Sequence, residues 1–351
     1  MDLLKLEPNK PKANLSDYVI LCYGVGKSGK TTLFYELAKE HFNGDLSKAL
    51  LVATEKGYKA LPNIHAVDVN SWKDVEELRT QLIENKDELS YEWIGIDTLD
   101  YLYEYCVEHV VRKERIAKKD SKIQTISDIA WGQGYAMVDT LMTKFVNSLI
   151  SAGYGIFMVT HDTTKQFTSR DGTQFDKTTL SLPTRVRNSV INMCDFIIYI
   201  SIEKVKDGDG LKDNRVIYLR SDSDIDAGSR FQSVPDTIPY DAKAFLDVFS
   251  EAVLNVYDHD VQAVEEAKIE QAKEKLEEAK EFIQAETRKA TESTVELVKE
   301  IGKKIKEMSK ETQDEVKDLF KKTFGSVNYK KYEEEELQKA IVLLDLPKEQ
   351  E

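Results

Sequence analysis

The segment Gly24–Thr31 reads GVGKSGKT, which matches the pattern GxxxxGK[ST] at every fixed position. It follows an apolar run at 18–23 that predicts a buried strand, and it precedes a predicted helix at 31–41. Glycines at these spacings let the backbone wrap around a phosphate chain, and the N-terminus of the following helix adds positive potential. The segment therefore predicts that the chain binds a nucleoside triphosphate.

Two residues of this loop have specific expected roles. Lys30 should reach the β- and γ-phosphates, and the Thr31 hydroxyl should ligate Mg²⁺, so the predicted cofactors are ATP and Mg²⁺. The predicted nucleotide-binding set comprises Gly24, Val25, Gly26, Lys27, Ser28, Gly29, Lys30, Thr31 and Thr32.

The net charge of −14 over 351 residues argues against a uniformly basic surface but allows a local basic groove. Three cysteines, Cys22, Cys106 and Cys194, are an odd number without metal-binding spacing, which favours reduced thiols. The first residues are charged rather than typical of a signal peptide, and no apolar stretch approaches a membrane span. We therefore expect a cytoplasmic protein without a membrane partner.

Up to about residue 250, apolar strands alternate with helical patterns. This alternation predicts an α/β fold with a mostly parallel sheet covered on both faces, whose ligand lies at the C-terminal ends of the strands. The predicted strands are 18–23, 49–54, 92–97, 155–160, 195–202 and 215–220, and the predicted helices are 31–41, 72–86, 99–118 and 131–152.

A change of composition after residue 258 divides the chain. Glycine becomes rare there, and Ala, Glu and Lys dominate. The apolar stripe that follows is rich in alanine, so it fits either a weak coiled coil or a solvated helical tether. We predict an N-terminal lead-in at 1–17, an α/β core at 18–257, a long amphipathic helical region at 258–310 and a small helical module at 311–351.

Two acids at predicted strand ends complete the nucleotide site. Asp97 ends an apolar strand, the position at which an aspartate holds the Mg²⁺ shell. The next residue is Thr98 rather than glutamate, so the catalytic base must come from elsewhere. Glu55 follows the strand at 49–54 and would face the γ-phosphate if that strand neighbours the strand of the phosphate loop. The alternative is a solvated acid at a strand end.

Over about residues 15–245, the chain resembles the RecA-like recombinase ATPases, most closely the compact phage-encoded proteins that anneal single strands. The resemblance rests on four segments in order: Gly24–Thr31, Val52–Gly57, Ile94–Leu99 and Ile156–His161.

In that family, the glutamate that matches Glu55 activates water. The polar residue that matches His161 senses the γ-phosphate and passes the signal to the DNA-binding loop that follows. RecA has glutamine at the position of His161, and a purely structural histidine is the alternative here.

The segment 163–188 is locally basic and carries Phe167 and Phe175. Cations that bind phosphates and rings that stack on bases suit single-stranded nucleic acid. The alternative is an ordinary solvated hairpin that turns at Arg170-Asp171-Gly172. The candidate nucleic-acid-binding residues are Lys165, Arg170, Lys177, Arg185 and Arg187.

The resemblance also implies a homo-oligomer, either a ring or a filament, with ATP between subunits. Arg220 ends a late predicted strand and is the candidate for reaching the neighbouring subunit's γ-phosphate, with Arg230 as a rival.

The resulting prediction is a DNA-stimulated ATPase of phage-type recombination, strand annealing or replication. The chain lacks the separate N-terminal helical domain of several recombinases, so strand invasion is not part of the prediction. The acidic run Glu333–Glu336 favours a tail that recruits a single-strand-binding or other replication protein, or that inhibits the basic segment.

Two alternatives stay open. One is a P-loop kinase of small molecules, for which Val111–Arg115 is the only lid candidate and lies too early in the chain. The other is a non-catalytic, ATP-dependent switch or scaffold that acts through its helical tail.

Overall fold

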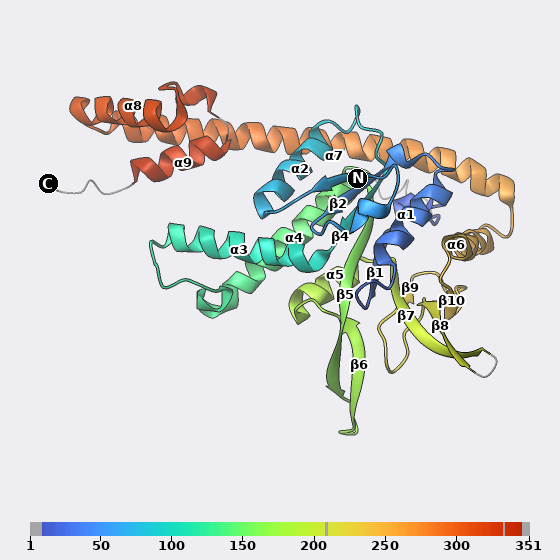
Figure 1. Ribbon diagram of the computed structural model, residues 1–351. Coiled ribbons are helices and arrows are strands. Elements are labelled where there is room, and N and C mark those ends of the chain that lie inside the picture. The colour runs from blue at the N-terminus through green and yellow to red at the C-terminus, as the bar shows by residue number, and fades with distance from the viewer. Residues whose placement is uncertain (1–8, 208–209, 333, 346–351) are drawn as a thin grey trace. The chain divides into compact units, whose positions relative to one another are not determined.

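A ten-stranded β-sheet organises residues 19–239 (Figure 1). The computed structural model describes residues 9–207, 210–332 and 334–345. Along the sheet, the strand order is β10 (Thr237–Pro239), β8 (Gly210–Tyr218), β7 (Phe196–Asp207), β1 (Val19–Gly24), β5 (Gly155–Thr168), β4 (Trp93–Asp97), β2 (Ala49–Ala53) and β3 (His65–Asp68). Two further strands lie off this path: β6 (Gln174–Leu180) pairs with β5, and β9 (Gly228–Ser229) pairs with β7.

The strands from β3 to β7 along this order are all parallel, which confirms the predicted α/β fold with a mostly parallel sheet. The remaining pairings, which involve β6, β8, β9 and β10, are antiparallel. Strands β1, β2 and β4 are buried along their whole length because helices cover both faces. Strand β3 was not predicted, since it is short and only partly buried.

Helices cover the sheet in two layers. Ile20 and Phe157 pack with α1 and α6, whereas Leu21 and Met158 alternate with them along their strands and face the other side. Helices α2, α3 and α4 contact one another. The helices of this part are α1 (Lys30–His41), α2 (Trp72–Glu84), α3 (Leu99–Ala117), α4 (Gln133–Ser151), α5 (Thr184–Met193) and α6 (Ala242–Val256). The first four begin and end within two residues of their predicted bounds, whereas α5 and α6 were not predicted.

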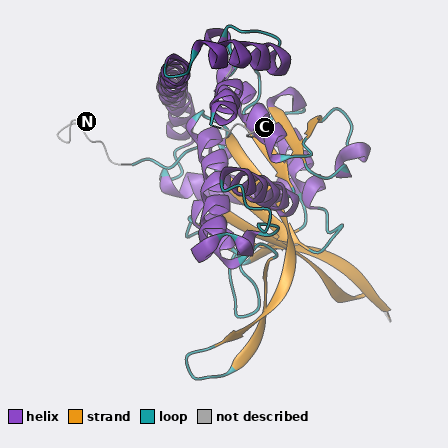
Figure 2. Ribbon diagram, turned by 90° about the vertical axis from the view of Figure 1, so that its left-hand side faces the viewer, coloured by secondary structure: helices purple, strands orange, loops and turns teal. Residues whose placement is uncertain are grey.

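Two hairpins extend past the carboxyl edge of the sheet. Strands β5 and β7 continue to Thr168 and Asp207, beyond their predicted ends, because each pairs with an antiparallel partner. Figures 1 and 2 show the β5–β6 and β7–β8 hairpins leaving the sheet on the same side. Since β1 lies between β5 and β7, the loop after β1 emerges between the roots of the two hairpins.

The first compact unit extends to Ala279, past the predicted boundary at residue 257. Helix α7 (Val261–Lys306) buries Val264 in the core of this unit. The backbone N–H of Ala13 donates to Oε1 of Gln271 at 2.8 Å, so the described part of the predicted lead-in, residues 9–17, also belongs to this unit. The amino-acid composition changes after residue 258, but packing against the first unit continues to Ala279. The reason is that the first turns of α7 bury only a narrow face, so most of their residues are polar.

The second unit spans 280–351 and has its own apolar core. Its helices are the remainder of α7, α8 (Lys310–Phe324) and α9 (Glu334–Leu344). Ile301 at the end of α7 is buried with Phe320 of α8, so the predicted boundary at residue 310 would cut through this core. Of the predicted acidic run, Glu333 lies outside the described residues. Across the described residues, every helix falls short of the length or the apolar content that a membrane span requires.

Candidate functional site

The phosphate loop connects β1 to α1 at the carboxyl edge of the sheet. Gly24 and Gly29 have φ angles of 153° and 108°. A Cβ at Gly24 would lie 2.6 Å from the Ile200 carbonyl oxygen, and one at Gly29 would lie 2.4 Å from the Tyr240 hydroxyl. Both positions therefore require glycine for conformation and for space.

Tyr240 supports this loop from a distant part of the chain. Its hydroxyl donates to the Gly29 carbonyl at 2.7 Å, and burial raises its pKa to about 12. Sequence reasoning missed Tyr240, because no local pattern relates it to a loop more than two hundred residues earlier. It keeps the loop in place without offering a charge to a nucleotide.

The residues of the loop fit a triphosphate. Lys30 is only 6% exposed, and its Nζ donates to the carbonyls of Gly24 and Val25, both at 2.9 Å. The Ser28 hydroxyl is buried and has no hydrogen-bond partner among the described residues. Phosphate oxygens are the acceptors that a buried ammonium group and an orphaned hydroxyl need.

The structure brings the two predicted metal ligands together. Thr31 Oγ1 donates to Asp97 Oδ2 at 2.5 Å, and Asp97 is 4% exposed. The pKa of Asp97 is raised above its ordinary value, mainly because the side chain is buried and also because the Glu55 charge is near. The Thr31 hydrogen bond and the Lys30 charge lower this pKa but do not reverse the rise. A hydroxyl and a carboxylate at one point supply the oxygen ligands that Mg²⁺ prefers beside phosphates.

Glu55 lies on the far side of Asp97 from the phosphate loop. The condition under which Glu55 was expected to face the γ-phosphate, that its strand neighbours the loop strand, is not met, because β5 and β4 lie between β1 and β2. Glu55 nevertheless reaches the site: Thr98 Oγ1 donates to Glu55 Oε1 at 3.3 Å. Strands β2 and β4 are parallel neighbours, so their carboxyl ends meet and place Glu55 beside Asp97.

His161 lies next to the phosphate loop, opposite Gly24 in the pairing of β5 with β1. Its Nδ1 is 3.2 Å from Asp100 Oδ2, and its backbone N–H donates to the same oxygen at 3.1 Å. The hydrogen bond with Asp100 raises the pKa of His161, and burial opposes this rise. Burial also opposes ionisation of Asp100, but hydrogen bonds from His161 and Ser181 prevail and lower its pKa to about 2.

Sequence reasoning also missed Asp100. The signal was present: Asp100 is an acid in the first turn of α3, three residues after Asp97. Acids at helix N-termini are common for local reasons, so this position alone did not distinguish Asp100.

The predicted basic segment forms the β5–β6 hairpin followed by α5, rather than a loop. On one face of the hairpin, Lys165 lies opposite Lys177 and Phe167 lies opposite Phe175. The two phenyl rings stack with their centroids 6.0 Å apart and an interplanar angle of 27°. Cationic and aromatic pairs thus follow one another along the same face.

The cations of the hairpin differ in their availability. Arg170 is exposed at the tip, and Lys165 Nζ donates to the Leu182 carbonyl at 3.4 Å. Lys177 is largely buried and pairs with Asp226 at 2.7 Å, so its charge is already compensated.

The two arginines of α5 are less available for binding nucleic acid than the sequence predicts. Arg185 pairs with Asp139 at 3.3 Å while remaining 58% exposed. Arg187 is only 8% exposed, which argues against the nucleic-acid-binding role predicted for it. Its side chain packs inward because α5 turns that face toward the unit, and its Nη1 has no hydrogen-bond partner among the described residues.

Arg220 and Arg230 both bind backbone or carboxylate groups of their own chain. Arg220 Nη2 donates to the carbonyls of Phe231 and Gln232 at 2.7 and 2.6 Å. Arg230 Nε lies 3.1 Å from a carboxylate oxygen of Asp195. These contacts give each arginine a local structural role within one chain.

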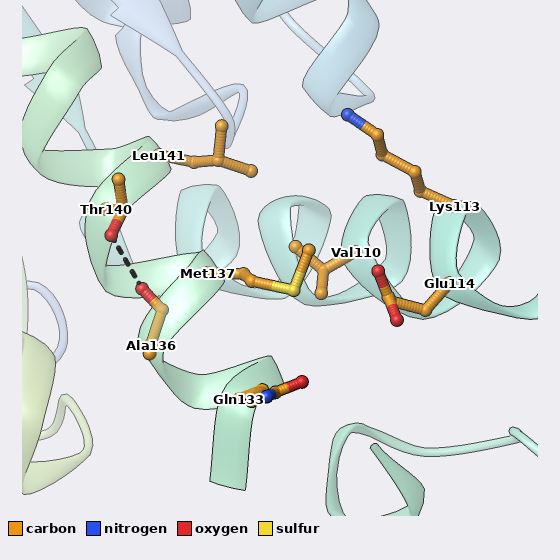
Figure 3. Close-up of a pocket in the computed structure, with 8 residues that line it drawn as sticks. All are labelled: Val110, Lys113, Glu114, Gln133, Ala136, Met137, Thr140 and Leu141. Carbon is orange, nitrogen blue, oxygen red and sulfur yellow. Dashed lines mark hydrogen bonds between the residues drawn. The ribbon is translucent and has the colours of Figure 1, made fainter. Parts of the chain in front are cut away.

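A cavity of about 440 Å³ lies between α3 and α4 and contains none of the predicted nucleotide-site residues (Figure 3). Apolar and polar side chains line it in equal number, and three of the four apolar ones come from α4. Its lining residues are Val110, Lys113, Glu114, Gln133, Ala136, Met137, Thr140 and Leu141.

Two comparisons with known proteins bear on this arrangement. A family described as an AAA domain matches residues 16–231, which include the phosphate loop, Glu55, Asp97 and His161. The chain is also similar to the SPbeta prophage-derived uncharacterized protein YorG of Bacillus subtilis (strain 168). The two are 23% identical over 246 residues, which cover 68% of this chain and 67% of the relative.

Proposed function

This chain belongs to the AAA domain family of P-loop ATPases, and on that basis we propose that it hydrolyses ATP to control single-stranded DNA bound at the β5–β6 hairpin. The ATPase proposal rests on one observation: Thr31 at the start of α1, Asp97 at the end of β4 and Glu55 after β2 lie together. The alternation of lysines and phenylalanines on the hairpin supports the DNA part.

Each residue of the nucleotide site has one role. Lys30 exchanges its carbonyl acceptors for β- and γ-phosphate oxygens, and the loop N–H groups bind the rest of the phosphate chain. Thr31 and Asp97 would hold Mg²⁺, which would neutralise phosphate charge at the site.

Glu55 acts as the general base. It accepts a proton from the attacking water, whose oxygen forms a bond to the γ-phosphorus while the bond from that phosphorus to the β,γ-bridging oxygen breaks. ADP leaves with the bridging oxygen. The hydrogen bond from Thr98 keeps the Glu55 carboxylate beside Asp97 and pointed toward the site. His161 would contact the γ-phosphate from the neighbouring strand β5, where it lies opposite Gly24.

Single-stranded DNA would bind along the hairpin face that carries Phe167 and Phe175. Bases stack on aromatic rings without sequence preference, and nearby cations bind the backbone. Of the predicted cations, Arg170 and Arg185 are exposed, and Lys165 is partly exposed and carries no carboxylate partner in the described structure. Lys177 contributes mainly by holding the hairpin to Asp226.

Assembly and biological setting are further parts of the proposal. We place the protein in phage-type recombination, annealing or replication, because the relative is prophage-derived and the motifs resemble RecA-like ATPases. A homo-oligomer with Arg220 acting between subunits would require Arg220 to exchange its present carbonyl partners. The helical unit at 280–351 is the candidate site for a replication partner.

The test is ATP turnover and DNA binding of the full chain. Phosphate release is measured with and without an oligodeoxythymidylate, in wild type and in Glu55→Gln. Hydrolysis that rises with the oligonucleotide and disappears in Glu55→Gln supports the proposal. Transfer of the γ-phosphate to a small molecule would instead support a kinase, and nucleotide binding without turnover would support a switch or scaffold.

A further inference from the structure

Four donors from Thr160, His161 and Ser181 converge on the carboxylate of Asp100. Thr160 Oγ1 donates to Oδ2 at 3.0 Å, and the backbone N–H of His161 reaches the same oxygen at 3.1 Å. The His161 imidazole is the third donor, through Nδ1, and the Ser181 hydroxyl donates to the other carboxylate oxygen, Oδ1. One side chain of α3 therefore binds both ends of a segment outside its own helix.

These donors mark the two roots of the β5–β6 hairpin. Thr160 is the last fully buried residue of β5, and Ser181 directly follows the end of β6. The Ser181 backbone N–H also donates to the His161 carbonyl at 3.0 Å, which closes the base of the hairpin. Strands β5 and β6 pair continuously from the Asp162–Leu180 pair to the Thr168–Gln174 pair. A displacement of the root should therefore move the whole hairpin.

The same carboxylate lies close to the nucleotide site. Asp100 follows Asp97 by three residues, at the point where β4 gives way to α3. His161 lies opposite Gly24, the first residue of the phosphate loop. Movement of either His161 or Ser181 therefore alters a hydrogen bond to the Asp100 carboxylate, which accepts from both residues.

We propose that Asp100 is the positioning residue that couples nucleotide state to the β5–β6 hairpin, by holding His161 and Ser181 on one carboxylate. This inference rests on the proposed function, in which His161 meets the γ-phosphate and the hairpin binds single-stranded DNA. When His161 turns toward the γ-phosphate, its bond to Asp100 changes, and Asp100 transmits the change to Ser181 and the hairpin root. Asp100 itself contacts neither phosphate nor DNA.

The test separates coupling from binding. The variants are Asp100→Asn, which removes the charge, and Ser181→Ala, which removes only the hairpin arm. Glu104→Gln is the matched control, because Glu104 is an exposed acid one turn further along α3. For each protein, the Kd of a fluorescent oligodeoxythymidylate is measured without nucleotide and with Mg²⁺ and a non-hydrolysable ATP analogue.

A second readout does not require DNA. Cys22, Cys106 and Cys194 are all buried, so a cysteine introduced by Thr168→Cys near the hairpin tip can be labelled selectively with a fluorophore. Each labelled variant is compared with itself before and after the ATP analogue is added. This signal reports movement of the hairpin even if single-stranded DNA is not its ligand.

We expect the analogue to change the oligonucleotide Kd of wild type and Glu104→Gln by a factor within the usual allosteric range of about 5–150. In Asp100→Asn and Ser181→Ala this factor should fall to about one and the fluorophore response should disappear, while Kd for the analogue stays within about twofold. Coupling that persists in Ser181→Ala, or that is absent from wild type in both readouts, overturns the inference. If wild type binds no oligonucleotide but its fluorophore responds through Asp100, the DNA proposal fails and the coupling stands.

Discussion

The hydroxyl of Thr31 donates a hydrogen bond of 2.5 Å to the carboxylate of Asp97, across 66 residues of sequence. Thr31 lies in the first turn of α1, and Asp97 is the last residue of β4. Their contact joins the phosphate loop to the carboxyl end of β4. There, the hydroxyl of Thr98, the next residue, donates a hydrogen bond to Glu55. This series of contacts separates the residues proposed to bind phosphate from the residue proposed to act on water.

The first prediction follows from that separation. Lys30→Ala should abolish ATP binding, because Lys30 supplies the buried ammonium group of the loop. Glu55→Gln should leave ATP affinity within about twofold and lower kcat by about 10²–10⁴, the usual contribution of a general base. Fluorescent-nucleotide binding and phosphate release measure the two effects. Glu84→Gln, an exposed acid at the end of α2, is the control. Wild-type turnover in Glu55→Gln would assign the base to another residue.

The second prediction concerns the hairpin. Lys165→Ala with Arg170→Ala should reduce the slope of log affinity against log salt by about 0.7 for each DNA phosphate that the variant no longer binds. Phe167→Ala with Phe175→Ala should weaken binding by about 1–3 kcal/mol per stacked base while leaving the slope nearly unchanged. Fluorescence anisotropy of an oligodeoxythymidylate over a salt series measures both quantities.

Lys243→Ala is the control for this series, since Lys243 pairs with Asp247 within α6. It should change neither affinity nor slope. Equal slopes in wild type and the double lysine–arginine variant would place the DNA site elsewhere on the protein.

The third prediction is a pH dependence of stability that runs through His161. Its folded pKa is raised above the ordinary 6.5 by Asp100, so its stabilisation is fully present below about pH 6.5 and is lost as pH rises through the folded pKa. Asp100 has its pKa lowered to about 2, so its contribution is present above 3.8 and is lost as pH falls toward 2.

Urea unfolding of wild type and His161→Gln tests this sign. The stability advantage of wild type should be largest near about pH 5–6 and should shrink toward about pH 9. An advantage that is constant or that grows with pH would show that the Asp100–His161 pair is not ionic in the folded protein.

The fourth prediction concerns the length of the ATPase unit. Truncation after Ala279 should leave folding and ATP affinity intact, because the contacts of the first unit end there. Truncation after Tyr257 should lower the midpoint of thermal unfolding, since it removes buried Val264 and the Gln271 side chain that accepts from Ala13. Differential scanning calorimetry of the two truncated chains decides between them, and equal midpoints would restore a boundary near 257.

Much of the fold could be predicted from the sequence because its signals are local. The phosphate loop is specified by glycine and lysine at fixed spacings, and the flanking strand and helix follow from runs of apolar residues. Asp97 could be placed at a strand end for the same reason. Helices α1 to α4 are long enough for their periodicity to define both ends closely.

The hairpins could not be placed as well. The segments 161–168 and 203–207 are mostly polar and have no core to face, so their strand character comes from pairing with a partner strand. Whether Lys177 and Arg187 are free cations depended on Asp226 and on the packing of α5, neither of which a local pattern reveals.

By itself, the sequence determined that this chain has a phosphate loop, an acid at the end of a later strand and an α/β core, since these depend on contiguous residues. The tertiary structure alone decided that β5 and β4 separate β2 from β1. It also decided that Tyr240 supports Gly29 and that Asp100 binds both His161 and Ser181. The physical reason is that strand order and long-range hydrogen bonds depend on how distant segments pair, and the energy of pairing is shared between segments that carry no common local pattern.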